Sequence, residues 1–175
     1  MTRGVVVVGV DGSRGALAAI RWAAVEARLR RTSLRVVHAY TYTFPTAGGG
    51  GYGNPYVGGS TEALLSAGPN DLHQAAEELL EKVIADVAAD VEGLEIERRV
   101  VAGAAVEVLI HAVAEHDLLV VGSRGHGGFA GLLLGSVSAQ CAHLAPCPVV
   151  IVRPAEQRPA GRAGRLARSD SDVAA

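Results

Sequence analysis

Short apolar runs alternate with helical periodicity along this chain, and that alternation constrains the fold more than any other feature. Five segments have the length and aliphatic content of buried strands: Val5–Val10, Leu34–Tyr40, Glu95–Val101, Asp117–Gly122 and Val149–Arg153. The first, fourth and fifth are continuous apolar runs, which predicts strands covered on both faces. Apolar residues recur at helical spacing between them, in residues 16–31, 71–91, 104–116 and 136–145. This alternation predicts an α/β fold, a five-stranded parallel sheet with helices on both faces.

The apolar residues of each predicted helix fall on one stripe. In the last helix the stripe consists of Val137, Cys141 and Leu144, and Pro146 ends the helix. The chain has 175 residues, of which 49% are hydrophobic and 4% aromatic, so aliphatic side chains must fill the core. This length suits one domain of ordinary size, which we place at residues 1–154.

Two segments lack the alternating pattern. Residues 41–69 are rich in Gly, Pro and Tyr, and a segment of this length is long for a loop in a compact domain. We expect a flexible insertion; the alternative is a lid over a ligand, because the segment leaves the carboxyl end of the second strand. Residues 155–175 are rich in Ala, Arg, Pro, Gly and Ser without apolar periodicity, which predicts a disordered tail.

A glycine-rich motif follows the fourth predicted strand. Gly122-Ser123-Arg124-Gly125 is followed by Gly135-Ser136, in the pattern G-x2-G-x9-G-S. Glycine lets the backbone approach an anion, and a helix capped by Ser136 presents free N–H groups and the positive end of its dipole. The motif therefore predicts a phosphate site. It is not a P-loop, because the chain's one lysine, Lys82, lies outside these loops, so main-chain N–H groups, hydroxyls and Arg124 are expected to hold the phosphate.

A second polar constellation, Gly9-Val10-Asp11-Gly12-Ser13, follows the first predicted strand. Asp11 can accept hydrogen bonds from ribose hydroxyls or from an adenine amino group. The alternative is that Asp11 or Ser13 caps the following helix, as these residue types commonly do. In a doubly wound parallel sheet, ligands bind at the carboxyl ends of the strands, where the winding direction reverses. Both loops should open at that edge, which favours the nucleotide interpretation.

The combination of these features resembles the universal stress protein family, in its ATP-binding branch. The resemblance covers roughly residues 3–154 and rests on the D-G-S turn, the strand that ends near His38-Ala39, and the ungapped G-x2-G-x9-G-S motif. It implies a Rossmann-like sandwich of the adenine-nucleotide alpha hydrolase kind. It also implies a universal stress protein-like domain that binds ATP, with Mg²⁺, and forms a homodimer through the last strand, Val149–Val152.

The resemblance also implies roles for individual residues. Asp11 would meet the adenosine part, with Gly9 and Val10 lining it, and Ala39 would face the base. Val121 and Gly122 would line the nucleoside side. The residues expected around the phosphates and their metal are Arg124, Gly125, Gly135, Ser136, Val137 and Ser138. Arg124 stands where the family frequently has a histidine, and its guanidinium remains suited to a phosphate contact.

Charge and cysteine content bear on partners and location. The formal net charge of −2 argues against a nucleic-acid partner. The apolar run Val5–Val8 is too short for a signal peptide or a membrane span. Two cysteines, Cys141 and Cys147, do not make a disulfide framework. These features predict a cytoplasmic protein without a membrane partner.

Other candidate residues have simpler explanations. Cys141, His143 and Cys147 lack a fourth metal ligand, and we assign Cys141 to the core. His38 ends a buried strand and is expected to be a hydrogen-bonded core histidine. His126 lies in the glycine loop, where contact with a phosphate and simple exposure are both open. No Ser-His-Asp arrangement, paired-carboxylate site or zinc spacing is evident, so no catalytic residue is assigned.

We therefore expect a regulatory binding module of the stress response rather than an enzyme. The alternatives are a slow ATP hydrolase, a cyclic-AMP-binding protein and a dimerising scaffold with a vestigial site. Valine at Gly122 or Gly135 is expected to fill the phosphate space, abolish nucleotide binding and leave the fold largely intact. Asp11→Ala is expected to weaken the binding of adenosine-containing ligands.

Overall fold

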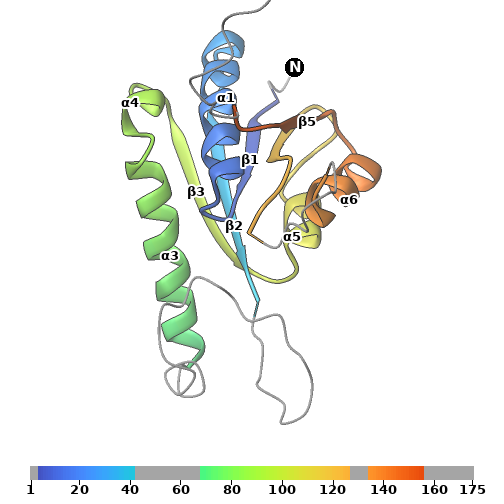
Figure 1. Ribbon diagram of the computed structural model, residues 1–175. Helices are drawn as coiled ribbons and strands as arrows, with labels where there is room; N and C mark the ends of the chain where they lie inside the picture. The colour runs from blue at the N-terminus through green and yellow to red at the C-terminus, as the bar shows by residue number, and fades with distance from the viewer. Residues whose placement is uncertain (1–3, 42–67, 127–133, 156–175) are drawn as a thin grey trace, which may run out of the picture.

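A five-stranded parallel sheet forms the centre of the structure, a computed structural model that describes residues 4–41, 68–126 and 134–155. The strands lie in the order β3-β2-β1-β4-β5, and every pairing is parallel (Figure 1). Their bounds are β1 Val6–Val10, β2 Leu34–Tyr40, β3 Ile96–Ala102, β4 Leu118–Gly122 and β5 Val149–Val152. The predicted α/β fold is confirmed, and each predicted strand is present with its ends shifted by at most one residue.

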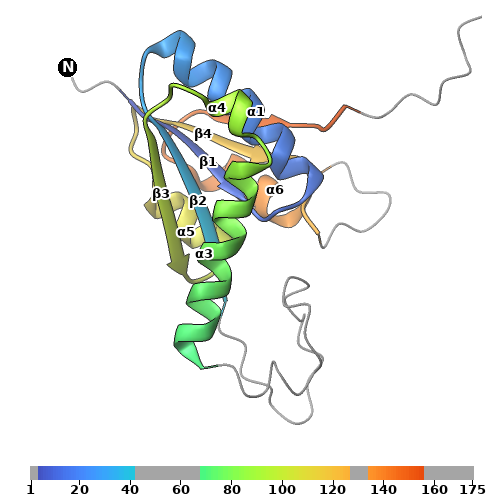
Figure 2. The same ribbon diagram turned by 90° about the vertical axis from the view of Figure 1, so that its left-hand side faces the viewer.

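Helices cover both faces of the sheet. Their bounds are α1 Arg14–Arg30, α3 Pro69–Ala85, α4 Ala88–Val91, α5 Ala105–His111 and α6 Ser136–Leu144. Buried residues of α1, α3 and α4 form one core cluster with one face of the sheet, and those of α5 and α6 form a second cluster with the other face. Figure 2 shows the two layers on opposite sides of the strands.

The helix expected at residues 71–91 is interrupted. Helix α3 ends at Ala85, and Val87 adopts φ −123° and ψ 19°, outside the helical region, before α4 begins. The side chain of Val87 is nevertheless fully buried in the core with Val83 and Val91. The apolar spacing therefore identified the buried residues correctly but did not reveal the break in the helical hydrogen bonding.

Two strands that were expected to be buried are partly open to solvent. Strand β3 has three half-buried and four exposed residues, and all four residues of β5 are half-buried. The reason is their position, because among the described residues each is an edge strand with a single neighbour. Leu144, placed on the core stripe of the last helix, is also wrong as a core residue, since it is 60% exposed at the end of α6.

Small side chains let α1 lie close to the sheet. Its buried positions are mainly alanine: Ala16, Ala19, Ala23, Ala24 and Ala27. These pack against the valines of β1 and β4 in one cluster. Short side chains on the helix reduce its distance from the strands, so the first turn of α1 reaches the end of β4. There the main chain of Gly122 lies against that of Gly15.

The expectations for the insertion at 41–69 and the tail at 155–175 fall on residues 42–67 and 156–175, which lie outside the described residues. Within the described ranges, no helix has both the length and the apolar character needed to cross a membrane.

Candidate functional site

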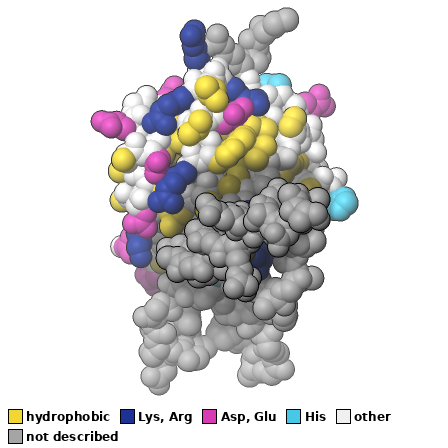
Figure 3. Space-filling model, turned by 45° about the horizontal axis from the view of Figure 1, so that its top comes forward, with side chains coloured by type: hydrophobic (Ala, Val, Ile, Leu, Met, Phe, Trp, Pro, Cys, Tyr) yellow, Lys and Arg dark blue, Asp and Glu magenta, His cyan; other side chains and the backbone are white. Residues whose placement is uncertain are grey.

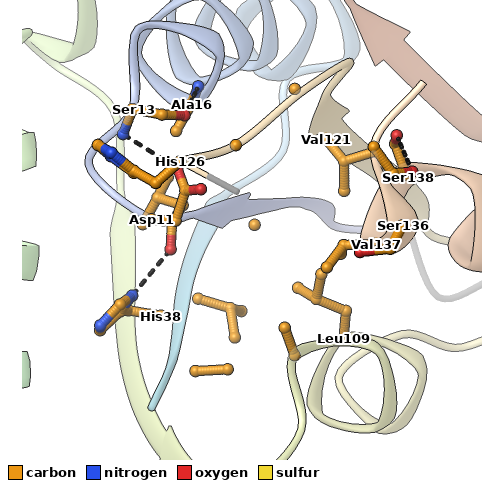
Figure 4. Close-up of a pocket in the computed structure, with 18 of the residues that line it drawn as sticks. Asp11, Ser13, Ala16, His38, Leu109, Val121, His126, Ser136, Val137 and Ser138 are labelled. Atoms are coloured by element: carbon orange, nitrogen blue, oxygen red, sulfur yellow. Dashed lines mark hydrogen bonds between the residues drawn. The ribbon is translucent and has the colours of Figure 1, made fainter. Parts of the chain in front are cut away.

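The sheet opens at the carboxyl end of its central strands. Strand β1 pairs with β4 only from Val6 to Val8, whereas its pairing with β2 continues to Val10, opposite His38. Beyond Val8 the two central strands separate, at the point where the chain winds in opposite directions on either side of β1. Ligands bind at such switch points in open α/β sheets. A cavity of about 560 Å³ lies at this opening (Figure 4).

The turn from β1 to α1 forms the first wall of the cavity. Asp11 Oδ1 accepts a hydrogen bond from the Ser13 N–H at 3.0 Å, and Gly12 provides the positive φ of 78° that this tight turn requires. Ser13 is the N-cap of α1, and its Oγ accepts from the Ala16 N–H at 3.2 Å. The cap is therefore Ser13, and the half-buried carboxylate of Asp11 faces the cavity instead (Figure 4).

The start of α6 forms the second wall. The Gly135 N–H donates to the Ser123 carbonyl at 2.7 Å, and the Ser138 hydroxyl lies 3.1 Å from the same oxygen and 3.0 Å from the Gly135 carbonyl. These bonds fasten α6 to the end of β4. The expected cap, Ser136, is wrong: Gly135 has extended dihedrals of −76° and 164° and is the N-cap, so Ser136 is the first helical residue. Its side chain thus lies one position further into the helix.

Two helix N-termini therefore meet at the cavity. Ala139 is the first residue of α6 whose N–H bonds within the helix, to the Gly135 carbonyl, so the N–H groups of Ser136, Val137 and Ser138 precede the helical ladder. The first turn of α1 approaches from the other side of β4. Free N–H groups and the positive ends of two dipoles suit an anion. Exposed Arg124 adds a positive charge to the same wall.

The glycines of the motif make close main-chain contacts. A Cβ on Gly125 would overlap Asp11 Oδ2, so the carboxylate rests on the backbone of that glycine. A Cβ on Gly122 would lie 2.7 Å from the carbonyl carbon of Gly15 and 2.9 Å from its oxygen. Real side-chain carbons do not approach backbone atoms so closely, and main-chain atoms cannot rotate away. The expectation that Gly122→Val leaves the fold intact is therefore wrong.

Apolar residues form the floor of the cavity. They come from β2 and from α5, and they include Val37, Ala39, Ala105 and Leu109. Leu109 is 4% exposed, and a Cβ on Gly9 would lie 2.9 Å from its Cδ1, so the leucine side chain lies directly on the β1 backbone. Leu109 belongs to the apolar spacing of residues 104–116. That spacing did not predict its place at the cavity, because it does not specify which turn of α5 reaches the end of β1.

The structure brings the whole set of predicted site residues to one cavity. Those that line it are Gly9, Val10, Asp11, Ala39, Val121, Gly122, Arg124, Gly125, Gly135, Ser136, Val137 and Ser138. His126, for which a phosphate contact was left open, also lines it. Residues that line it and were not predicted to bind a ligand are Ser13, Ala16, Val37, His38, Tyr40, Thr41, Gly103, Ala105 and Leu109. Their contacts with a ligand remain predictions.

The cysteines and histidines behave as core or surface groups in the described residues. Cys141 is fully buried, as expected, and burial raises the pKa of its thiol and of the Cys147 thiol. His38 is buried and its Nδ1 lies 2.8 Å from the Val10 carbonyl oxygen, which confirms a hydrogen-bonded core histidine. Within the described part of the chain, no three His, Cys, Asp or Glu side chains gather as a metal site.

A doubly wound parallel sheet with a glycine motif and two helix N-termini at its switch point is the architecture of a phosphate- or nucleotide-binding α/β protein. Residues 2–153 match the Universal stress protein family, and the chain belongs to that family. The resemblance recognised in the sequence is thereby confirmed.

Individual relatives agree with this assignment. A universal stress protein of Mycolicibacterium smegmatis is 32% identical over 152 residues, which are 87% of this chain and 49% of that protein. The chain thus spans about half the length of the curated relatives it matches. Among solved structures, a universal stress protein in complex with cAMP is 27% identical, with a TM-score of 0.61 over 89% of this chain and 100% of that one.

UspA from Lactobacillus plantarum, 19% identical, has a TM-score of 0.63 over 87% of this chain and 100% of its own, and it shares the fold.

Proposed function

We propose that this chain binds ATP, carried with Mg²⁺, in the cavity at the end of β1, and that it acts as a regulatory module of the stress response. The observation that carries the proposal is the arrangement of three chemically different surfaces around one cavity. An apolar floor, a carboxylate and two helix N-termini lie side by side at the sheet opening. A volume of about 560 Å³ lies within the range of small-molecule sites.

The walls match the three chemical parts of a nucleotide. The adenine ring would lie on the floor beside Ala39 and Leu109, with the ribose near Asp11, whose carboxylate accepts from hydroxyl groups. The phosphates would lie at the start of α6, where the N–H groups of Ser136 and Val137 and the Arg124 guanidinium are donors. Each assignment follows from the polarity of the wall concerned.

The metal would be held mainly by the nucleotide itself. Mg²⁺ in nucleotide sites is commonly bound by phosphate oxygens, waters and one or two protein oxygens. The described residues offer the Ser136 hydroxyl beside the proposed phosphate position, and this group fits such a role. The Ser138 hydroxyl is directed to the carbonyls of Ser123 and Gly135, so we assign it to holding α6 in place.

We further propose a homodimer that forms through β5. All four residues of this edge strand are apolar and half-buried. Unpaired apolar edges promote pairing with another strand, and a second copy of β5 presents the same edge. Figure 3 shows hydrophobic side chains gathered among charged ones on the upper part of the molecule.

We also propose a cytoplasmic location, no nucleic-acid partner, and residues 1–154 as the binding unit. The free, buried cysteines support the location, and the low net charge supports the absence of a nucleic-acid partner.

Cyclic AMP is the second candidate ligand. The solved relative at 27% identity is described as a complex with cAMP. Cyclic AMP would use the floor and the Asp11 wall, but it carries one phosphate and needs no metal. Cyclic AMP would be favoured if calorimetry gives it an affinity that equals or exceeds that of Mg-ATP and that does not depend on Mg²⁺.

The first experiment identifies the nucleotide that the protein carries. The protein is purified from cells and denatured, and any released nucleotide is identified by chromatography. The emptied protein is then titrated with Mg-ATP by calorimetry. About one ATP or ADP per chain with saturable rebinding supports the proposal, and hydrolysis can then be timed. No released nucleotide and no binding heat at several temperatures would favour the scaffold alternative.

A further inference from the structure

His38 occupies the place where the sheet opens. It is the residue opposite Val10 in the β1–β2 pairing, and it is 6% exposed. Its Nδ1 lies 2.8 Å from the Val10 carbonyl oxygen (Figure 4). The carbonyl belongs to the peptide group that joins Val10 to Asp11, the residue that carries the carboxylate of the cavity wall.

The hydrogen bond determines the tautomer of the ring. A carbonyl oxygen only accepts, so Nδ1 must carry the proton. Within the described ranges, the other ring nitrogen, Nε2, has no hydrogen-bond partner. Burying an imidazole with one nitrogen unpaired costs free energy that a leucine at this position would avoid. The bond to Val10 is a hydrogen bond that a histidine makes here and a leucine cannot make.

The His38 bond acts at the last residue of the β1–β2 pairing, where the sheet has already divided. Strand β4 pairs with β1 only as far as Val8, opposite Val120. Val10 and Asp11 thus lie beyond the last β4 pairing, and their orientation depends on β2 and on the turn. The hydrogen bond from Ser13 to Asp11 Oδ1 holds the carboxylate from the turn side.

We infer that His38 is a positioning residue for ligand binding: its Nδ1–H holds the Val10–Asp11 peptide so that the Asp11 carboxylate faces the adenosine part of the ligand. The inference rests on the proposed function, because it assigns the task of Asp11 to that ligand. It adds a residue whose proposed effect runs through the main chain of Val10 and Asp11.

Two substitutions separate the hydrogen bond from the bulk of the ring. His38→Leu keeps a buried side chain and removes the donor. His38→Asn can place its amide nitrogen where Nδ1 lies and can restore the bond. Affinity for adenosine and Mg-ATP should fall about tenfold in the leucine variant and recover to within about threefold of wild type in the asparagine variant, the range expected for one hydrogen bond. Affinity for inorganic triphosphate should be unchanged in both.

Val83→Ala serves as the matched control for stability. Val83 is buried in α3 and does not line the cavity. Thermal unfolding should show that Val83→Ala is less stable than wild type. If this variant still binds adenosine with wild-type affinity, lost stability alone does not reduce affinity. If His38→Asn binds as weakly as His38→Leu, or if triphosphate affinity falls equally, the positioning role is overturned.

A double-mutant cycle with Asp11→Ala tests the route of the effect. If His38 acts through Asp11, adding His38→Leu to Asp11→Ala should reduce adenosine affinity by less than about twofold further. Additive losses would show that His38 acts elsewhere in the site and would overturn the inference.

A measurement without nucleotide distinguishes this inference from the proposed function. The Ser13 N–H donates to Asp11 Oδ1, so its hydrogen exchange reports how firmly the carboxylate is held. We expect faster exchange at Ser13 in His38→Leu by about fivefold or more, normal exchange in His38→Asn, and no change in Val83→Ala. If wild type binds no nucleotide, the proposed function fails, and unchanged Ser13 exchange in His38→Leu would overturn the positioning role independently.

Discussion

Gly122, at the end of β4, lies directly against Gly15 in the first turn of α1, and a side-chain carbon on Gly122 would come within 2.7 Å of the Gly15 carbonyl carbon. The contact joins the glycine motif to the first helix through backbone alone. Gly135 is different, because a Cβ there would meet its nearest neighbours, Arg124 Cα and the Ser123 carbonyl oxygen, at 3.5 Å. The two glycines therefore have different physical tasks.

Valine at these two positions should have different effects. Gly122→Val forces β4 and α1 apart and should lower the free energy of unfolding by about 2 kcal/mol or more, the range of overpacking at a rigid contact. Gly135→Val should cost about 1 kcal/mol as a poorer N-cap and should reduce Mg-ATP affinity. Urea unfolding and calorimetry measure both effects. Equal stability of the two variants would contradict the assignment of the Gly122 contact.

Asp11 and Ser13 should separate binding from stability. Ser13 caps α1, so Ser13→Ala should lower the free energy of unfolding by about 1 kcal/mol. Asp11→Ala removes the carboxylate that faces the cavity, and affinity for adenosine and Mg-ATP should fall about tenfold, with a smaller loss of stability. Calorimetric titration and thermal unfolding of both variants test this division. A destabilised Asp11→Ala variant with wild-type affinity would assign Asp11 to the turn alone.

The free edge of β5 should determine the oligomeric state. The carbonyls of Pro148 and Val152 accept from the N–H groups of Leu119 and Ser123. Alternate residues of a parallel ladder bond the same neighbour, so the main-chain groups of Val149 and Ile151 point outward. Ile151→Pro removes an outward donor while leaving the β4 ladder in place. We expect light scattering to show a dimer for wild type and for the control Ile151→Val, and a monomer for Ile151→Pro. A monomeric wild type would exclude pairing through this edge.

Glu97 should give the fold a weak acid dependence. The hydrogen bond from Arg35 lowers the pKa of Glu97 below its ordinary value of 4.5, with Arg99 acting in the same direction. A lowered pKa in the folded state contributes stability above pH 4.5 that is lost as the pH falls through the folded-state value. Because the pair is partly exposed, the contribution should be below about 1 kcal/mol.

Thermal unfolding of wild type and Glu97→Gln between pH 7 and pH 3 measures this contribution. The difference in stability between the two proteins should shrink as the pH falls below about 4.5, because protonated Glu97 no longer carries the charge that pairs with Arg35. A difference that stays constant or grows over that range would contradict the assignment.

Local patterns accounted for the elements and for the neighbourhood of the site. Val5–Val10 and Leu118–Val121 are apolar over the length of a strand, and each is followed by a turn that contains glycine. Two parallel strands followed by such turns place both turns at one edge of the sheet, so Asp11 and Gly125 could be predicted to be close. The same logic missed Leu109, because its helix is connected to the cavity only through packing.

Two differences from expectation, the cap of α6 and the exposure of β5, depend on segments far away in the sequence. The sequence predicted Ser136 as the cap of α6, whereas in the structure the cap is Gly135, whose N–H bonds to the Ser123 carbonyl. The edge position of β5 determines its exposure, although its residues are as apolar as those of β1.

The sequence by itself determined the order of strands and helices, the family and the two loops that meet at the cavity, because periodicity and turn chemistry act within a few neighbouring residues. Only the tertiary structure decided that Gly122 supports α1, that His38 holds the Val10 carbonyl and that Asp11 rests on Gly125. Those relationships depend on the register between strands and on the depth at which each helix packs, and both are set by contacts between segments far apart in the chain.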